Sequence, residues 1–326
     1  MTDWSKRKRL EAAIAGERCD RAPVALWRHW PGDDQNAAEL AASHLKWQQD
    51  YDWDLLKVSP SSSYAVQDWG VRDRWVGALE GTREYTHRSI QTPGDWEGLK
   101  PLDPSQGMLA TQIEALRLVG RGVGETVPFI ATIFSPLAQA KNLAGEEVML
   151  AHMRSHPQAF RRGLETITES TLRYIEAAKT TGISGVFYAL QHARYPLLNP
   201  EEFRTFGRPY DLRILEAVSD LWLNMVHIHS TDIMFDEVAD YPVQLINWHD
   251  RETGVSLTEG LKRIKGAASG GVSRWSLHQD SPEQALTEAR DALEQTGGRR
   301  FLLGTGCVAM ITTPAGNIRA LREAVE

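Results

Sequence analysis

The chain has 326 residues, a formal net charge of −7 and 42% hydrophobic residues, with 24% charged residues. This balance is that of a globular protein with enough apolar surface for a large core, and it argues against disordered and fibrous classes. The acidic charge also argues against nucleic acid as a partner, because phosphate binding requires a concentrated basic face.

The sequence carries no sign of membrane insertion or export. No stretch approaches 18 consecutive apolar residues, and the N-terminal segment lacks the apolar core of a signal peptide. The basic run at 6–9 favours a solvated helix turn over a membrane or nucleic-acid patch. Only two cysteines occur, Cys19 and Cys307, and we expect both to be reduced. These features predict a cytoplasmic enzyme without membrane contact.

Short runs of β-branched and aromatic residues alternate with longer segments of helical periodicity along the chain. We expect strands at 23–27, 53–58, 127–133, 183–190, 222–228, 243–247, 271–275 and 301–303. We expect helices at 37–49, 157–180, 200–219, 282–295 and 314–325. Eight βα units with right-handed crossovers predict an α/β fold of the (β/α)8 TIM-barrel type, one domain over residues 1–326. An open doubly wound sheet shares this alternation and stays an alternative.

A long stretch at 61–124 separates the second expected strand from the third. Within it, the alternating segment 74–90 is broken by Glu80-Gly81, which predicts a β-hairpin insertion after strand 2. Insertions of this length often serve as lids or binding walls.

Histidines gather where the expected strands end. In barrel enzymes the working residues lie at the carboxyl ends of the strands and in the following loops. Six of the ten histidines fall in such segments, and Cys307 follows the eighth strand. We therefore expect an aromatic-walled pocket for a small organic substrate at this mouth. The expected substrate-binding residues are Arg28, His29, Trp30, Gln191, His192, Trp248 and His278.

His227 and His229 are two residues apart on the fifth expected strand, so their side chains point to one face. Two imidazoles and the thiolate of Cys307 form a plausible zinc set with an open fourth position. The alternative is that both histidines are hydrogen-bonding residues of a polar pocket and Cys307 is a small buried thiol.

Two further residues are candidates for catalysis. Asp54 lies on the second expected strand and is a candidate carboxylate for proton transfer or for binding a cationic nitrogen. Lys57 is three residues further on and is expected to point to the opposite face. His249 follows the sixth strand, where Asp250 is placed to orient its imidazole.

Four segments follow the motifs of a known family: GERCDRAPV at 16–24, YDWDLLKVSP at 51–60, LNPEEFRTFGRPY at 198–210 and LLGTGCVAMITTPAGNIRALREAV at 302–325. They resemble the uroporphyrinogen decarboxylase superfamily over nearly the full chain. The resemblance implies a (β/α)8 barrel and places Asp54 at the family's active-site aspartate. It implies one of two reactions, because the superfamily includes cofactor-free tetrapyrrole decarboxylases and zinc-dependent methyltransferases that work with corrinoid proteins and thiols.

The chain departs from the decarboxylase motifs. Of the two arginines in their first loop, the segment 28–32 keeps only Arg28, and the histidine of their closing G-H-G is Thr305 here. The methyltransferases bind zinc through H-x-C and a later G-C, which resemble His227 and Cys307, with His229 in place of a cysteine. This exchange of thiolate for imidazole makes a bound zinc more Lewis acidic.

The leading hypothesis from the sequence is therefore a zinc-dependent methyltransferase with His227, His229 and Cys307 as ligands and a corrinoid on a partner protein as methyl carrier. The second hypothesis is a metal-free decarboxylase of a small aromatic or pyrrolic acid that uses Arg28 and Asp54. The third is a ligand-binding barrel without catalysis.

Overall fold

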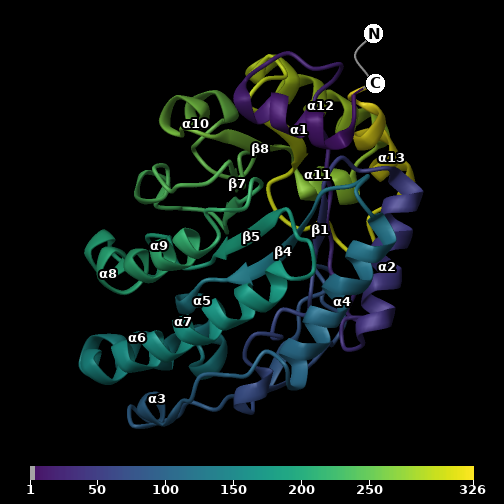
Figure 1. Ribbon diagram of the computed structural model, residues 1–326. Helices are drawn as coiled ribbons and strands as arrows, with labels where there is room; N and C mark the ends of the chain where they lie inside the picture. The colour runs from purple at the N-terminus through teal and green to yellow at the C-terminus, as the bar shows by residue number, and fades with distance from the viewer. Residues whose placement is uncertain (1–3) are drawn as a thin grey trace.

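A curled sheet of seven parallel strands forms the centre of the computed structural model, which describes residues 4–326 (Figure 1). The strand order is β1-β4-β5-β6-β7-β8-β9, so each strand pairs with its neighbours along the chain apart from the hairpin that follows β1. The strands are β1 (Leu56–Val58), β4 (Phe129–Phe134), β5 (Gly185–Leu190), β6 (Met225–Ile228), β7 (Leu245–Trp248), β8 (Ala267–Val272) and β9 (Phe301–Thr305).

The expected strand at 23–27 forms a single bridge instead of a strand. Val24 pairs in parallel with Leu303 of β9, and the Ala25 amide donates to the Leu303 carbonyl at 2.9 Å. On its other side the Asp54 amide donates to the Val24 carbonyl at 3.0 Å. The expected α/β architecture with a curled parallel sheet is thus confirmed, with seven strands and one bridging segment.

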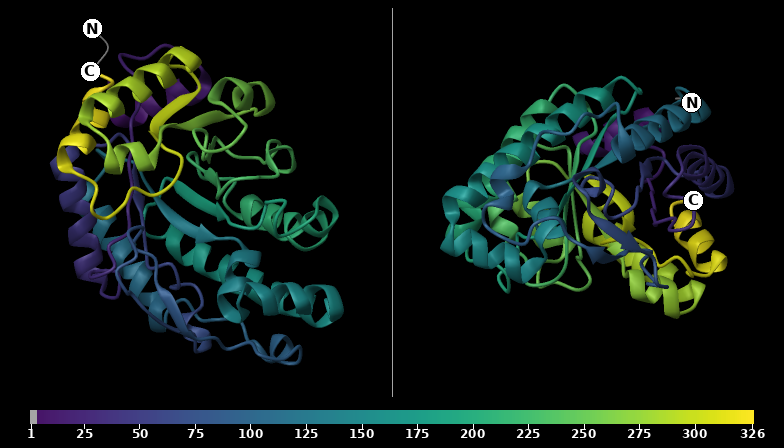
Figure 2. Two further views of the ribbon diagram at one scale, coloured as in Figure 1. Left: turned by 180° about the vertical axis from the view of Figure 1, so that it is seen from behind. Right: turned by 90° about the horizontal axis from the view of Figure 1, so that it is seen from below.

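Helices cover the outer face of the curled sheet (Figures 1 and 2). Among residues 4–326, no helix is long and apolar enough to cross a membrane. The α-helices are α1 (Lys6–Ala15), α2 (Ala37–Tyr51), α3 (Asp95–Gly98), α4 (Gly107–Val123), α5 (Pro136–Ala144), α6 (Glu146–Ser155), α7 (Pro157–Lys179), α8 (Pro200–Phe206), α9 (Arg208–Ala217), α10 (Leu257–Arg263), α11 (Arg274–Gln279), α12 (Pro282–Thr296) and α13 (Ala315–Glu323). Two short 3₁₀ helices are η1 (Gln67–Trp69) and η2 (Phe235–Glu237).

Two sequence expectations about element boundaries were wrong. The helix expected at 200–219 is broken into α8 and α9 at Gly207, two residues before Pro209, which has no backbone N–H to continue the helix. The strand expected at 271–275 lies earlier, as β8. The prediction was misplaced because the Ala-Ala-Ser-Gly-Gly sequence of β8 lacks the β-branched residues on which strand recognition depends. Ser273 caps α11 directly after it.

The expected hairpin insertion is confirmed. Strands β2 (Arg72–Arg74) and β3 (Glu84–His87) pair in antiparallel fashion after β1. The turn between them packs onto the loop after β9, since the Ile311 amide donates to the Leu79 carbonyl at 2.8 Å. Gly81 lies in the left-handed region with φ +76°, and a Cβ there would lie 2.6 Å from Cβ of His29. The insertion is therefore held close to the sheet.

Candidate metal centre

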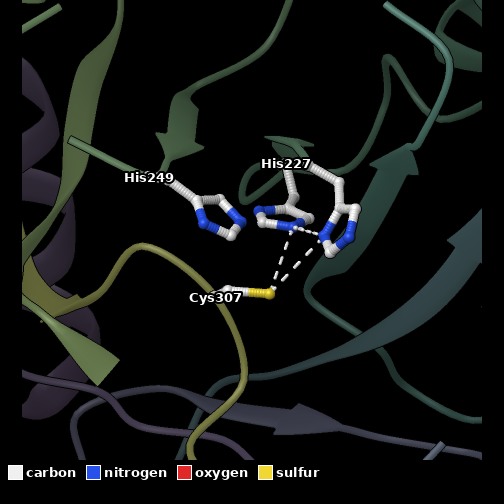
Figure 3. Close-up of side chains that lie close together, drawn as sticks. His227, His249 and Cys307 are labelled. Atoms are coloured by element: carbon white, nitrogen blue, oxygen red, sulfur yellow. Dashed lines mark hydrogen bonds between the residues drawn. The ribbon is translucent and has the colours of Figure 1, made fainter. Parts of the chain in front are cut away.

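Three histidines and one cysteine converge at the carboxyl ends of the strands. The side chains are His227 in β6, His229 just past β6, His249 just past β7 and Cys307 just past β9. One potential ligand atom from each lies within 4.8 Å of the other three. Cys307 Sγ is 3.7 Å from His227 Nε2 and 3.6 Å from His229 Nδ1. Figure 3 shows the imidazoles of His227 and His249 and the thiol of Cys307 pointing to a common point.

Local sequence explains why these groups meet. His227 and His229 share the inner face of the sheet because they are two residues apart, and the His229 amide extends the pairing of β6 by donating to Leu190 at 2.9 Å. Cys307 reaches them because Gly306 precedes it. A Cβ at Gly306 would lie 2.6 Å from both the His249 Cα and the Trp248 carbonyl oxygen, so a larger residue would push the loop away from β7.

Asn247 fixes the orientation of His227. Its Oδ1 lies 2.7 Å from His227 Nδ1, and its Nδ2 donates to the carbonyls of Ser269 at 2.9 Å and Thr305 at 3.0 Å. Because the amide nitrogen is already used, Oδ1 accepts from the imidazole, and the lone pair of Nε2 is left for the centre. The sequence analysis missed Asn247, although it lies on the neighbouring strand in register with His227.

The electrostatics of the cluster favour a thiolate at Cys307. Burial alone would raise the pKa of the Cys307 thiol, but His229 and His227 together lower it well below its ordinary value. Burial lowers the pKa of His227. Burial also opposes the charged form of His249, but Cys307 and Glu252 outweigh it and raise that pKa to about 9. The set therefore combines a thiolate with imidazoles, the donors that zinc prefers.

His249 provides an independent test of the fit to a metal. Its Nε2 is buried and has no hydrogen-bond partner among the described residues, although its Nδ1 lies 3.3 Å from Glu252 Oε1. A buried imidazole nitrogen without a partner is costly unless a ligand satisfies it. The four residues thus fit a metal, with His249 as a possible fourth ligand beyond the three that the sequence indicated.

A pocket opens beside the cluster. Its lining includes both apolar and polar side chains, and the hairpin insertion contributes to it. Its lining residues besides the cluster are Trp27, His29, Lys57, Ser62, Glu80, Thr82, Thr132, Phe134, Phe187, Ala189, Gln191 and Val308.

Lys57 is a pocket residue that the sequence analysis mentioned but did not count among the site residues. Its side chain is 3% exposed, its Nζ donates to Ser59 Oγ at 2.9 Å, and burial lowers its pKa to about 7. The neighbouring Leu56 and Val58 belong to the hydrophobic core, so strand alternation turns Lys57 inward. This alternation was the signal that could have identified it.

Asp54 was expected to be a catalytic carboxylate, but it does not line the pocket, because it precedes β1 at the opposite end of the sheet. Its carboxylate is fully buried between Arg9 Nη1 at 2.7 Å and Arg21 Nη1 at 2.6 Å, and it also accepts from the Val24 amide at 2.9 Å. With both oxygens occupied by the protein, Asp54 has a structural environment and not that of an acid or base facing substrate.

The expected substrate-binding residues divide into three groups. His29 and Gln191 line the pocket. Arg28 and Trp30 line a separate hollow together, where the guanidinium lies 4.0 Å from the Trp30 ring centroid. The remaining three are absent from the lining as well: His192 is buried with both ring nitrogens unpartnered among the described residues, Trp248 packs against Phe235, and His278 lies in α11.

A chain of charges links the hairpin insertion to His249. Glu80 pairs with Arg274, whose Nε lies 3.6 Å from Glu252 Oε1, and Glu252 is in turn the partner of His249 Nδ1. None of these three residues was identified from the sequence as a site residue, because they come together only through the hairpin, α11 and the loop after β7.

Comparisons with known proteins identify the family of this chain. The chain matches the family model described as uroporphyrinogen decarboxylase (URO-D) over residues 74–326. The methylcobamide:CoM methyltransferase MtbA of Methanosarcina acetivorans is 19% identical over 99% of this chain and 98% of that protein. MtaA of Methanosarcina barkeri, with the same description, is 25% identical over 98% and 97%. A uroporphyrinogen decarboxylase of Syntrophotalea carbinolica is 28% identical, but over 63% of this chain and 58% of that protein.

Solved structures show the same fold. A methyltransferase from Methanosarcina mazei superposes with a TM-score of 0.87 at 21% identity, covering 99% of this chain and 98% of that chain. A B12-independent methionine synthase from Shewanella sp. W3-18-1 superposes with a TM-score of 0.52 at 13% identity, covering 93% and 92%. Because the family model matches most of its length, the chain belongs to the uroporphyrinogen decarboxylase family, and its full-length similarity is to the methyltransferase branch of that superfamily.

Proposed function

We propose that this protein is a zinc-dependent methyltransferase that moves a methyl group from a corrinoid on a partner protein to a thiol or another small organic acceptor. The observation that carries the proposal is the convergence of His227, His229, His249 and Cys307 within 4.8 Å beside a pocket. The methyl donor is proposed from the relatives, whose names describe methylcobamide:CoM methyltransferases. In this proposal the segment at 23–27 completes the sheet as the eighth member of a (β/α)8 barrel.

The protein's residues have distinct tasks. His227, His229 and Cys307 would hold the zinc, and His249 would be available as a further ligand. Zinc bound there lowers the pKa of a thiol or hydroxyl, which favours the nucleophilic anion at neutral pH. Asn247 keeps Nε2 of His227 directed at the centre. Trp27 and Phe187 cover one side of the pocket and exclude water from the nucleophile.

The methyl transfer requires that the nucleophilic atom of the acceptor lies in line with the methyl carbon and the cobalt–carbon bond that breaks. The acceptor anion forms a bond to the methyl carbon, and the electron pair of the broken cobalt–carbon bond stays with the corrinoid donor. No proton moves in this step, since the acceptor has lost its proton beforehand. The pocket residues therefore contribute by positioning and by keeping the acceptor dry.

The alternative function, a metal-free decarboxylase, depends on Asp54 and Arg28 as site residues. Asp54 is enclosed by two arginines at the far end of the sheet, and Arg28 lines a different hollow. Neither can reach a substrate in the pocket that contains Cys307.

Methylcobalamin serves as a soluble donor for testing the proposal. We expect the purified protein to convert added thiols to methyl thioethers, measured by mass spectrometry together with loss of the methylcobalamin absorbance. Removal of zinc by a chelator should abolish the conversion, and zinc should restore it. Unchanged turnover after complete loss of zinc would refute the proposal, and Lys262→Met, at an exposed site in α10, provides a variant that should behave like the native protein.

A further inference from the structure

A second hollow, which we call the α2 hollow, lies between α2 and the segment 28–30. Trp27 and His29 line the pocket beside the metal cluster, so the alternation of the extended chain turns the intervening Arg28 to the opposite side, where it meets α2. None of the residues of the α2 hollow lines that pocket. Its lining residues are Arg28, Trp30, Ser43, Lys46, Trp47, Asp50 and Tyr51.

One edge of the Arg28 guanidinium is free. Its Nη1 donates to the Ile311 carbonyl at 2.7 Å. Among residues 4–326, its Nε is buried without a hydrogen-bond partner, and its Nη2 donates to no acceptor either. A buried donor without a partner is costly. Nε and Nη2 form the side of the guanidinium that binds a carboxylate through two parallel N–H groups, so this free edge is suited to an oxyanion.

The described part of the chain also provides no counter-ion for Arg28. No Asp or Glu oxygen of residues 4–326 lies within ion-pair distance of the guanidinium. Asp50 is the carboxylate in the lining, and it pairs with Lys46 at 2.9 Å. Burial lowers the pKa of Arg28, and the acidic groups nearby do not outweigh this effect. An anion in the hollow would supply the charge that the chain does not.

The walls of the α2 hollow are aromatic. The guanidinium carbon of Arg28 lies 4.0 Å from the Trp30 ring centroid and 5.4 Å from that of Trp47. The two indole rings meet edge to face with centroids 5.8 Å apart, and the Tyr51 ring centroid lies 4.6 Å from that of Trp47. The rings hold the cation by cation–π contacts. Aromatic walls beside a cation favour a ligand whose charged group is attached to an aromatic ring.

We propose that the α2 hollow is a second binding site, specific for a small aromatic carboxylate, with Arg28 as its charged residue. The carboxylate would accept from Nε and Nη2, and its ring would pack against the aromatic walls. This inference goes beyond the proposed function, because the site shares no residue with the metal cluster or its pocket. A ligand there would also stabilise the loop after β9, since Nη1 of the same guanidinium holds the Ile311 carbonyl.

A pair of probes that differ in charge but little in shape tests the site. Isothermal titration calorimetry would compare benzoate with benzamide, and we expect the native protein to bind benzoate at least about 10-fold more tightly. Arg28→Met should remove this preference. Arg121→Met removes the same charge at an exposed site in α4 and should keep it. Metal-free and zinc-loaded protein should show the same preference, because no metal-cluster residue lines the hollow.

Equal binding of benzoate and benzamide by the native protein would overturn the inference, as would a preference that persists in Arg28→Met or that depends on zinc. If Arg28→Met does not fold, as judged by circular dichroism, Arg28→Lys replaces it. Lysine keeps the charge but lacks the two parallel donors, so benzoate binding should weaken, and unchanged binding would refute the site. Failure of the proposed function would appear differently, as an absence of methyl transfer with the preference for benzoate intact.

Discussion

The two ends of the parallel sheet differ in whether the protein itself provides partners for the buried polar groups. Before β1, Asp54 has a partner for each oxygen, from Arg9, Arg21 and the Val24 amide. At the carboxyl ends, by contrast, Lys57 has no carboxylate and His249 Nε2 has no partner among the described residues. Charges that are satisfied within the chain stabilise the fold, whereas those left without partners indicate a bound ligand.

The largest effect is expected at the satisfied end. Asp54→Asn keeps the shape of the side chain but removes the carboxylate partner of Arg21 and one of the two carboxylates paired with Arg9, so the free energy of unfolding should fall by about 3–5 kcal/mol. Urea denaturation measures this loss. Asp20→Asn is the control, because Asp20 pairs with Arg9 from a more exposed position and should cost less. Full stability with abolished turnover in Asp54→Asn would instead make Asp54 catalytic.

Asp211 extends the comparison to a buried acid whose partners are hydroxyls. Tyr188 and Tyr241 donate to it at 2.6 and 2.9 Å, and burial raises its pKa to about 7. The native state thus binds more protons than the unfolded state between about pH 4 and 7, so this residue's contribution to stability falls as pH rises through that window.

The size of the Asp211 contribution is on the order of 4 kcal/mol at most. Unfolding free energies of the native protein and Asp211→Asn should therefore change differently from pH 4 to pH 7, with the steeper decline in the native protein. Parallel curves for the two proteins would show that the Asp211 pKa is not raised.

A substitution of Asn247 tests how strongly zinc binding depends on the orientation of His227. Asn247→Ala removes the acceptor for His227 Nδ1, and zinc affinity should fall about 10- to 100-fold in a competition assay with a chromogenic chelator. Asn317→Ala removes another buried amide, which donates to the Leu277 carbonyl and does not contact His227. The zinc affinity of this variant should be unchanged. The same loss in both variants would point to general destabilisation.

The smallest effect is expected at the hairpin insertion. Glu80→Gln breaks the pair with Arg274, and because Glu80 is 33% exposed the stability should fall by less than about 1 kcal/mol. Amide hydrogen exchange should increase in the hairpin at 72–87 and stay constant in β4 to β7. A change in zinc content would show instead that the chain of charges from Glu80 to His249 contributes to zinc binding.

Much of the fold could be predicted from the sequence because its signals are local. Alternation of strand and helix patterns located most of the sheet, and prolines behind polar residues marked the beginnings of α8 and α12. β8 was misplaced because its small residues owe their strand conformation to packing between β7 and β9.

The site was predictable where one strand or one loop carries the information. His227 and His229 followed from strand alternation, and the sequence motif around Gly306 pointed to Cys307. The contact between Cys307 and His229 spans 78 residues and depends on sheet curvature, which no local pattern encodes. Strand alternation predicted that Asp54 and Lys57 point to opposite faces, but it did not say which of them faces the pocket, and the structure places Lys57 there.

Zinc content tests the central claim most directly. Native protein, His229→Ala and Cys307→Ala would be purified in parallel, shown to be folded by circular dichroism, and measured by inductively coupled plasma mass spectrometry. We expect about one zinc per native chain and a large loss in both variants, because each removes a ligand of a site with no more than four. Equal zinc content in all three proteins would contradict the proposed centre.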